Sequence, residues 1–271
     1  YNATNDHTFM TVEEKFNLLN TEGNYASNYN EFYNDSKQFS LMSYINGHGS
    51  DSNVEFIAHS VVTPMAADFV ALSRLYSLSP NVQDEDTVWG YNSTHTVNYL
   101  RTLYDDYTNT MPNDYRIPAH SIYDTGGTDT WDLTGFGFRF KSTINLEPGT
   151  YSSVLGGKDN VYIVPISEIE ILKSTNFDDE ITTAQTFRNT VYCYKGDDTV
   201  QAFSGDVIHG GIGNDNITIG NDQIELKASA LRSIGASAYG DDGNDTITTY
   251  SDVGNVTVHS GMGSDVITTL E

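Results

Sequence analysis

The chain carries its clearest signal at Gly210-Gly211-Ile212-Gly213-Asn214-Asp215-Asn216-Ile217-Thr218. Two related stretches follow at residues 240–248 and 260–268. All three approximate the nonapeptide G-G-x-G-x-D-x-U-x, in which U is a bulky apolar residue. The glycines permit a turn with positive φ, the Asp supplies a hard oxygen ligand, and the apolar residue points inward from a short strand. Each copy therefore predicts one turn of a parallel β-roll that carries half of a calcium site.

Other copies of the nonapeptide are incomplete. Asp241 replaces a glycine in the second copy, and Ser260 opens the third. Weaker copies occur at Asp179-Glu180-Ile181, Gly196-Asp197-Asp198-Thr199-Val200, Asp206-Val207-Ile208 and Asp222-Gln223-Ile224. Ordinary Gly/Asn/Asp hairpin turns of an all-β domain could explain one such copy. The regular spacing of the whole array instead favours a roll similar to the calcium-binding repeats of RTX proteins.

The chain is strongly acidic, with 13 Lys and Arg against 37 Asp and Glu and a net charge of −24. Such a chain repels itself unless cations neutralise it, and nucleic acid and anionic membranes are unsuitable partners. No apolar run approaches the roughly 20 residues of a transmembrane segment. Cys193 is the single cysteine, so bound calcium is expected to stabilise the chain in place of disulfides. Because resting cellular calcium is too low for such sites, we expect a secreted protein.

The region before Pro80 has the composition of loops with one or two helices. Thr11 could cap a short helix that continues to Leu19. A clearer helix is predicted over residues 65–76, directly after Thr63-Pro64. Its apolar residues recur at three- and four-residue spacing, which predicts one buried face made of Met65, Phe69, Leu72 and Tyr76.

After Pro80 the sequence changes to short alternating segments separated by turns, and from about residue 121 onward it is typical of β-strands. No copy of the repeat falls in residues 227–236, which we interpret as an insertion. The predicted fold class is therefore mostly β, with a C-terminal parallel β-roll preceded by a loop-rich part. We place the domains at residues 1–80 and 81–271.

Three segments, in this order, resemble the serralysin family of secreted bacterial zinc metalloproteases, which are metzincins. Gln38 to Tyr44 resembles the Met-turn of that family, and the helix ending at Tyr76 resembles the last helix of its protease domain. Asp124-Thr125-Gly126-Gly127-Thr128-Asp129-Thr130 is similar to the start of its calcium-binding roll. The similarity extends over most of the chain from about residue 30. It implies that residues 1–80 are the C-terminal part of a metalloprotease-like domain.

The resemblance also implies roles at a zinc site. Met42 would lie beneath the zinc as an apolar floor, and Tyr44 would reach the metal with its phenol oxygen. The alternative is that both are core residues of a tight turn. Metzincins hold zinc with H-E-x-x-H-x-x-G-x-x-H, but no His in this chain is followed by Glu. The histidines have no metal-ligand spacing, and we expect them in solvated loops.

The chain therefore lacks a complete catalytic site. In the family the residues after the third zinc ligand resemble Tyr1-Asn2-Ala3, and the sequence stops at Glu271 directly after a repeat. Both observations predict a piece of a longer polypeptide. Zinc is then expected only together with an upstream segment or chain, and this chain alone should have no proteolytic activity.

The candidate calcium ligands form two sets. The repeats supply Gly210, Gly211, Gly213, Asp215, Gly240, Gly243, Asp245, Gly261, Gly263 and Asp265, and the weaker copy adds Asp198. By resemblance, a separate pair of sites would use Asp124, Gly126, Gly127 and Asp129, with Glu168 and Glu170 nearby and the carbonyl groups of Gln83, Glu85 and Thr87. The turn at residues 174–177 lacks the glycines and is expected to hold no ion.

Two functions are compatible with these features. The first is the C-terminal part of a secreted serralysin-type zinc endopeptidase, with protein or peptide substrates and, by resemblance, type I secretion. The second is a non-catalytic, calcium-dependent extracellular scaffold, such as a surface-layer or adhesin component, derived from that architecture. The Met-turn segment and the helix before Pro80 argue against an adhesin without protease ancestry. The sequence that precedes this chain in its gene would separate the two functions, because an intact H-E-x-x-H there supports the first.

Overall fold

The computed structural model describes residues 36–43, 58, 60–104, 117–135, 140–220 and 234–270. Two α-helices lie in this part of the chain, α2 (Ala66–Tyr76) and α3 (Asn98–Thr102). The strands before the complete repeats are β1 (Val88–Gly90), β2 (His120–Ile122), β3 (Thr130–Asp132), β4 (Thr143–Asn145), β5 (Tyr151–Ser152), β6 (Val161–Ile163), β7 (Ile171–Lys173), β8 (Glu180–Thr182), β9 (Thr190–Tyr192) and β10 (Thr199–Ala202). The remaining strands are β11 (Val207–Ile212), β12 (Asn216–Ile219), β13 (Ser237–Asp242), β14 (Thr246–Tyr250), β15 (Thr257–His259) and β16 (Val266–Leu270).

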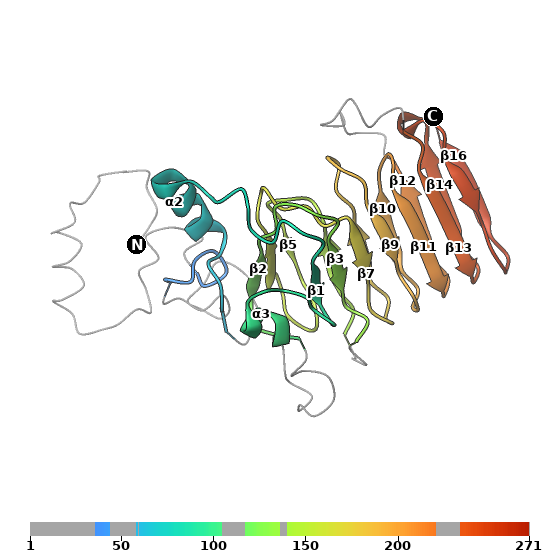
Figure 1. Ribbon diagram of the computed structural model, residues 1–271. Coiled ribbons are helices and arrows are strands. Elements are labelled where there is room, and N and C mark those ends of the chain that lie inside the picture. The colour runs from blue at the N-terminus through green and yellow to red at the C-terminus, as the bar shows by residue number, and fades with distance from the viewer. Residues whose placement is uncertain are drawn as a thin grey trace, which may run out of the picture.

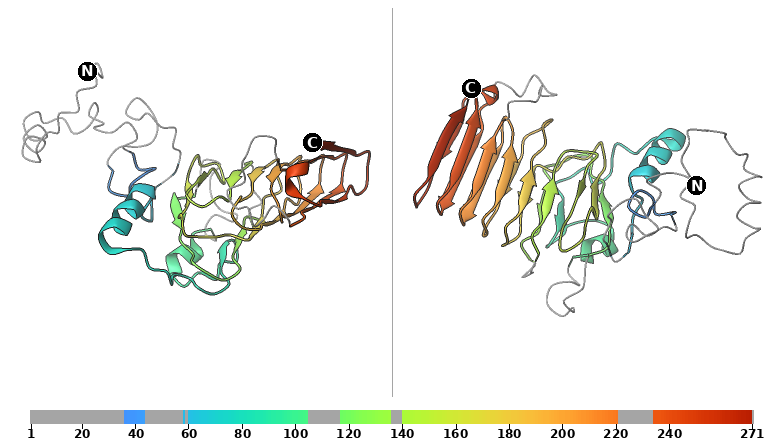
Figure 2. Two further views of the ribbon diagram at one scale, coloured as in Figure 1. Left: turned by 90° about the horizontal axis from the view of Figure 1, so that it is seen from above. Right: turned by 180° about the vertical axis from the view of Figure 1, so that it is seen from behind.

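From β7 onward the strands form a parallel roll. They alternate between two sheets, with the orders β1-β3-β7-β9-β11-β13-β15 and β16-β14-β12-β10-β8-β4, and every pairing within these two sheets is parallel. Figures 1 and 2 show the two stacks of strands facing each other along the roll. A third sheet, β2-β6-β5, lies toward the α2 end of the molecule. The predicted mostly-β class with a C-terminal parallel β-roll is confirmed.

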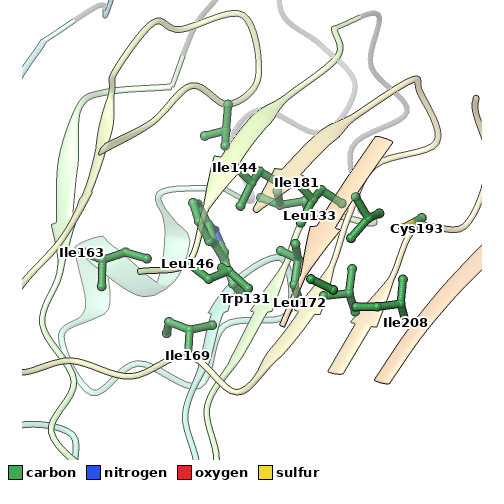
Figure 3. Close-up of a cluster of buried hydrophobic side chains, with 14 of the residues drawn as sticks. Trp131, Leu133, Ile144, Leu146, Ile163, Ile169, Leu172, Ile181, Cys193 and Ile208 are labelled. Carbon is green, nitrogen blue, oxygen red and sulfur yellow. The ribbon is translucent and has the colours of Figure 1, made fainter. Parts of the chain in front are cut away.

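The apolar residue of each repeat forms the core between the two sheets. In the six-stranded sheet Ile181, Val200, Ile217 and Ile247 occupy equivalent register positions, and each is at most 2% exposed. Figure 3 shows aliphatic side chains of both sheets, with Trp131 among them, filling the space between the strands. Because each fully buried side chain of this size contributes roughly 1.5–3 kcal/mol, the repeated apolar position stabilises the rungs up to β14, whereas the equivalent Ile267 on β16 is 53% exposed.

Helix α2 buries less of its surface than its sequence pattern predicts. Met65 and Phe69 are buried against Ala119, Tyr162 and Val164. Leu72 and Tyr76 are 37% and 78% exposed, so the prediction that they share this buried face is wrong. Within the described part of the chain, only the first half of α2 packs against the body of the protein.

Other expectations for the N-terminal half have mixed outcomes. The helix expected from Thr11 to Leu19 and most of the insertion expected at residues 227–236 lie outside the described residues. The sequence analysis does not predict helix α3. It expects strands from about residue 121, but strand β1 already begins at Val88. Both elements are too short to show a helical or strand period of apolar residues in the sequence.

The histidines do not all lie in solvated loops, so that expectation is wrong for this part of the chain. His95 is 5% exposed and His120 is 1% exposed. The Nε2 atom of His120 lies 2.9 Å from the hydroxyl of buried Tyr104, and its Nδ1 lies 3.0 Å from the carbonyl oxygen of Pro118. His209 stacks between Tyr192 and Tyr239, with ring centroids 4.9 and 4.6 Å apart. These histidines are therefore structural.

Burial of His120 predicts a pH-dependent contribution to stability. Burial lowers the pKa of His120 from 6.5 to about 4, so the unfolded chain binds a proton at a higher pH than the folded chain. The contribution of the neutral imidazole is fully present above pH 6.5 and is lost as the pH falls toward 4. We expect the difference in unfolding free energy between the wild type and His120→Gln to shrink by about 3 kcal/mol between pH 7 and pH 4. Urea unfolding with calcium present measures it, and a difference that is constant with pH contradicts the prediction.

Candidate functional site

The glycine–aspartate turns stack along one edge of the roll, at the ends of the strands of the seven-stranded sheet. Gly211 and Gly213 have φ values of 101° and 150°. A Cβ atom on Gly213 would lie 1.7 Å from the carbonyl oxygen of Gly196, and one on Gly243 would lie 1.5 Å from that of Gly213. The turns can stack at this spacing only because these positions carry no side chain.

A ladder of aspartate side chains connects one turn to the next. The Oδ1 atoms of Asp198, Asp215, Asp245 and Asp265 accept hydrogen bonds from the backbone N–H of the aspartate one turn earlier, at 2.7, 2.9, 2.9 and 3.1 Å. Asp198, Asp215 and Asp245 are each 1% exposed. One oxygen of each carboxylate thus holds the turns in register.

The second oxygen of these carboxylates has no hydrogen-bond partner. The Oδ2 atoms of Asp198, Asp215 and Asp245 are buried and unpaired. A Cβ placed on Gly210 would meet Asp215 Oδ2 at 2.4 Å and the carbonyl oxygen of Gly240 at 2.8 Å. On Gly240 it would meet Asp245 Oδ2 at 2.4 Å and the carbonyl oxygen of Ser260 at 2.2 Å. A carboxylate of one turn and a carbonyl group of the next therefore lie around the same small space.

The electrostatics of the ladder favour a cation in that space. Burial, together with neighbouring carboxylates, raises the pKa of Asp198 to about 9 and that of Asp215 to about 6. Burial also raises the pKa of Asp245. Ionised carboxylates are therefore unfavourable here unless a positive charge is close. A set of carboxylate and carbonyl oxygens is the ligand set that calcium prefers, so the residues fit this ion.

The glycine–aspartate turn at residues 124–129 also contains a buried carboxylate oxygen without a hydrogen-bond partner. Asp124 is fully buried; its Oδ2 accepts a hydrogen bond from Trp89 Nε1 at 2.8 Å, and its Oδ1 has no partner. Asp129 Oδ1 accepts a hydrogen bond from the backbone N–H of Thr87 at 2.8 Å. Burial, together with the neighbouring carboxylates of Asp124 and Glu170, raises the pKa of Asp129 to about 8. Sequence reasoning missed Trp89, which carries no signal beyond the need of a buried indole for a hydrogen-bond acceptor.

Residues far apart in sequence meet at this turn. A Cβ on Gly127, whose φ is 109°, would lie 2.7 Å from the carbonyl oxygen of Glu85. The backbone N–H of Asp129 donates to Glu170 Oε2 at 2.7 Å. The structure thus brings Glu85, Thr87, Asp124, Asp129 and Glu170 into one region. The side-chain oxygen of Gln83 accepts a hydrogen bond from the Thr96 hydroxyl, and Glu168 is exposed. The role expected for the carbonyl group of Gln83 stays a prediction.

The residues expected at a zinc site are only partly described. Met42 is 77% exposed and is packed neither in a core nor beneath a site in this chain, so its zinc role stays a prediction. Tyr44 lies outside the described residues. Within the described ranges, no group of three or more His, Cys, Asp or Glu side chains is arranged to hold a metal ion. The calcium candidates of the repeats do not depend on such a group, because each repeat turn combines one carboxylate with backbone carbonyl groups.

A parallel β-roll with stacked glycine–aspartate turns and an aspartate ladder defines the class of protein. Residues 79–267 match the family described as Peptidase M10 serralysin C terminal. This match covers more than half of the chain, so the chain belongs to that family. In the part that the structure describes, no helix has the length and apolar character needed to cross a lipid bilayer.

Several curated serralysins are similar to this chain. Serralysin C of Dickeya chrysanthemi is 38% identical over 144 residues, which cover 52% of this chain and 27% of that protein. Serralysin B of the same organism is 37% identical over 131 residues, or 48% of this chain and 24% of the relative. Serralysin of Proteus mirabilis is 32% identical over 151 residues, or 56% and 28%. The matched region thus spans about a quarter of the length of these relatives.

Turn stacking predicts that Gly213 cannot be replaced. We expect Gly213→Ala to lower the unfolding free energy by at least about 2 kcal/mol, because the added Cβ collides with Gly196 and alanine is strained at positive φ. The matched control is Ile212→Ala at the preceding residue, which is 54% exposed and should change stability by about 0.5 kcal/mol or less. Denaturant unfolding in calcium buffer measures both, and equal effects of the two variants would disprove the steric explanation.

Proposed function

We propose that this chain is the calcium-binding C-terminal part of a secreted zinc metalloendopeptidase of serralysin type. The observation that carries the proposal is the set of buried carboxylate oxygens without partners at Asp124, Asp198, Asp215 and Asp245. Four such atoms in one fold are costly unless a cation pairs with them. Similarity to serralysins supports the same assignment.

The proposed domain division is residues 1–80 and 81–271. The family match begins at residue 79, and β1, the first strand of the seven-stranded sheet, begins at Val88, which supports a roll domain from about this point. Helix α2 precedes this boundary and contacts the third sheet through Phe69. In the proposed parent, α2 is the last helix of the protease domain.

Catalysis in the parent requires residues that this sequence does not supply. A zinc ion held by three histidines would provide an activated water for attack on a peptide carbonyl. This chain has no H-E-x-x-H, so an upstream segment or chain must bring the metal-binding imidazoles and the general base. From this chain, Tyr44 would donate a hydrogen bond or ligand from its phenol oxygen, and Met42 would pack beneath the site. Protein or peptide substrates belong to that assembly.

An extracellular location follows from the calcium requirement. A net charge of −24 is tolerable in the folded state only when cations are plentiful. Calcium-dependent folding would keep the chain unfolded inside the cell and fold it outside, which suits export by a type I system.

A second candidate is a non-catalytic calcium-dependent scaffold, such as a surface-layer or adhesin component. It would share the calcium-binding turns of the roll with the first candidate. The scaffold would use the roll for spacing and adhesion and would need no zinc. Detection of H-E-x-x-H in the polypeptide that precedes this chain in its gene would exclude it.

Removing calcium should unfold the roll from about Gly196 onward before it affects α2. Without a cation the stacked aspartates repel, and one nonapeptide buries too little apolar surface to stay folded alone. Circular dichroism with and without EGTA measures the loss of β structure, and unchanged β content would refute the proposal.

Asp245→Asn should raise the calcium concentration at the folding midpoint by about 5-fold or more. The control Asp242→Asn, at an exposed position on β13, should leave it unchanged.

The chain alone should be catalytically silent. A single phenol ligand cannot bring the pKa of a metal-bound water close to neutrality, so we expect no zinc retained after dialysis and no cleavage of casein. Together with an upstream chain bearing the zinc motif, the protein should retain zinc and cleave casein. In that assembly, Tyr44→Phe should reduce the turnover rate more than it reduces the bound zinc. Chelator-sensitive proteolysis by the chain alone would contradict the upstream location of the zinc ligands. An assembly that carries the motif but binds no zinc would favour the scaffold.

A further inference from the structure

The aspartates of the roll fall into two kinds according to the partner of their second carboxylate oxygen. Asp198, Asp215 and Asp245 leave Oδ2 unpaired. Asp179 occupies the equivalent position one turn earlier and is also 1% exposed. Its Oδ1 accepts the backbone N–H of Ser142 at 2.6 Å, and its Oδ2 accepts the Thr175 hydroxyl at 2.8 Å and backbone N–H at 2.9 Å. This turn has no unsatisfied oxygen that requires a cation.

Thr175 explains the difference by its position. It lies four residues before Asp179, as Gly211 lies four residues before Asp215. The equivalent residues before Asp198 and Asp245 are Tyr194 and Asp241, and Oδ2 of Asp198, Asp215 and Asp245 receives no hydrogen bond. The threonine hydroxyl instead donates to the oxygen that would otherwise need a metal ion.

At the opposite edge of the roll, both carboxylate oxygens of Asp206 also have hydrogen-bond partners. Asp206 Oδ1 accepts the backbone N–H of Asn189 at 2.8 Å. Its Oδ2 accepts the backbone N–H of Phe203 at 2.8 Å and the hydroxyl of Thr183 at 2.5 Å. The Asn189 side chain accepts from Ala184 N and donates to the carbonyl oxygen of Ile169, both at 2.7 Å. Residues 171–192, which contain β7, β8, β9 and the two turns between them, are thus bounded on both edges by carboxylates with internal partners.

We propose that residues 171–192 form a metal-independent rung, which divides the roll into two calcium-dependent parts that lose calcium separately. One part is the turn region of Asp124 and Asp129, and the other is the ladder from Asp198 onward. The rung pairs with both parts, because β7 is hydrogen-bonded to β3 and β9 to β11 (Figure 1). This inference rests on the proposed calcium-binding function and adds how that function is subdivided.

The physical reason is that the hydrogen bonds from Thr175 to Asp179 need no calcium. Removal of calcium leaves unpaired charges at Asp198, Asp215 and Asp245, whereas both carboxylate oxygens of Asp179 keep their partners in Ser142 and Thr175. The apolar core positions of the rung, Leu172, Ile181 and Val191, are at most 2% exposed and packed in the main core. The rung is therefore the last part of the roll to open when calcium is removed, and it serves as a template on which either neighbouring part refolds when calcium returns.

Hydrogen exchange of the full 271-residue chain, with calcium and with EGTA, tests the inference. We expect EGTA to increase amide exchange at β1 and β3 and across β11–β14, and to leave residues 171–192 within about 3-fold of their rate in calcium. An equal increase at residues 171–192 and at β11–β12 overturns the inference while leaving the proposed calcium function intact. No change anywhere overturns both.

Paired variants separate the metal-independent bonds from the metal-dependent ones. Thr175→Val should raise exchange in residues 171–192 by about 3- to 10-fold, by the same factor in calcium and in EGTA. The effect of Thr183→Val, whose partner Asp206 lies in the ladder part, should be smaller in EGTA than in calcium. The matched control Asp215→Asn should raise exchange of β11 and β12 in calcium and have no further effect in EGTA. A Thr175→Val effect that disappears in EGTA overturns the inference. If either threonine variant fails to fold, the wild-type comparison still decides.

Discussion

Buried aspartate side chains stack along one edge of the roll, and the pairing of their oxygens governs the rest of the structure. One oxygen of each ladder carboxylate receives the backbone N–H of the preceding turn, as Asp215 does from Asp198 at 2.9 Å. The other oxygen needs either a hydroxyl of the chain or a cation, because an unpaired carboxylate oxygen is costly to bury. Asp179 takes the first solution through Thr175, whereas Asp215 and Asp245 are left to the second.

Stacking at this spacing also dictates which residues can occupy the turns and strands. Glycine is required where one turn touches the next, as at Gly213 against Gly196. Between the turns, only a few residues per strand are available, and one of them must fill the core, as Ile217 does. A rung that buries so little apolar surface has a narrow margin of stability. That margin explains why charge neutralisation in the turns can determine whether the rung folds.

Membership of the serralysin C-terminal family rests on residues 79–267, which include strands of both long sheets of the roll. The matched region spans about a quarter of the related serralysins. Helix α2 buries Phe69 against the body, while Leu72 and Tyr76 remain exposed. In the proposed parent, the roll would convert extracellular calcium into a folded platform, and the zinc chemistry would be supplied by residues that precede it. The zinc roles of Tyr44 and Met42 remain predictions that depend on that assembly.

The sequence by itself determined the roll, its inward apolar positions and the glycine-dependent turns, because a nonapeptide period encodes all three locally. It also indicated the aspartates of the ladder, which belong to the same period. Only the tertiary structure decided that Trp89 binds Asp124, that Thr183 closes Asp206 and that His120 is buried against Tyr104. These partners come from different turns or strands, and no local pattern specifies them. Leu72 and Tyr76 are exposed, contrary to the prediction from their spacing. The spacing of apolar residues defines a helix face but does not determine what covers that face.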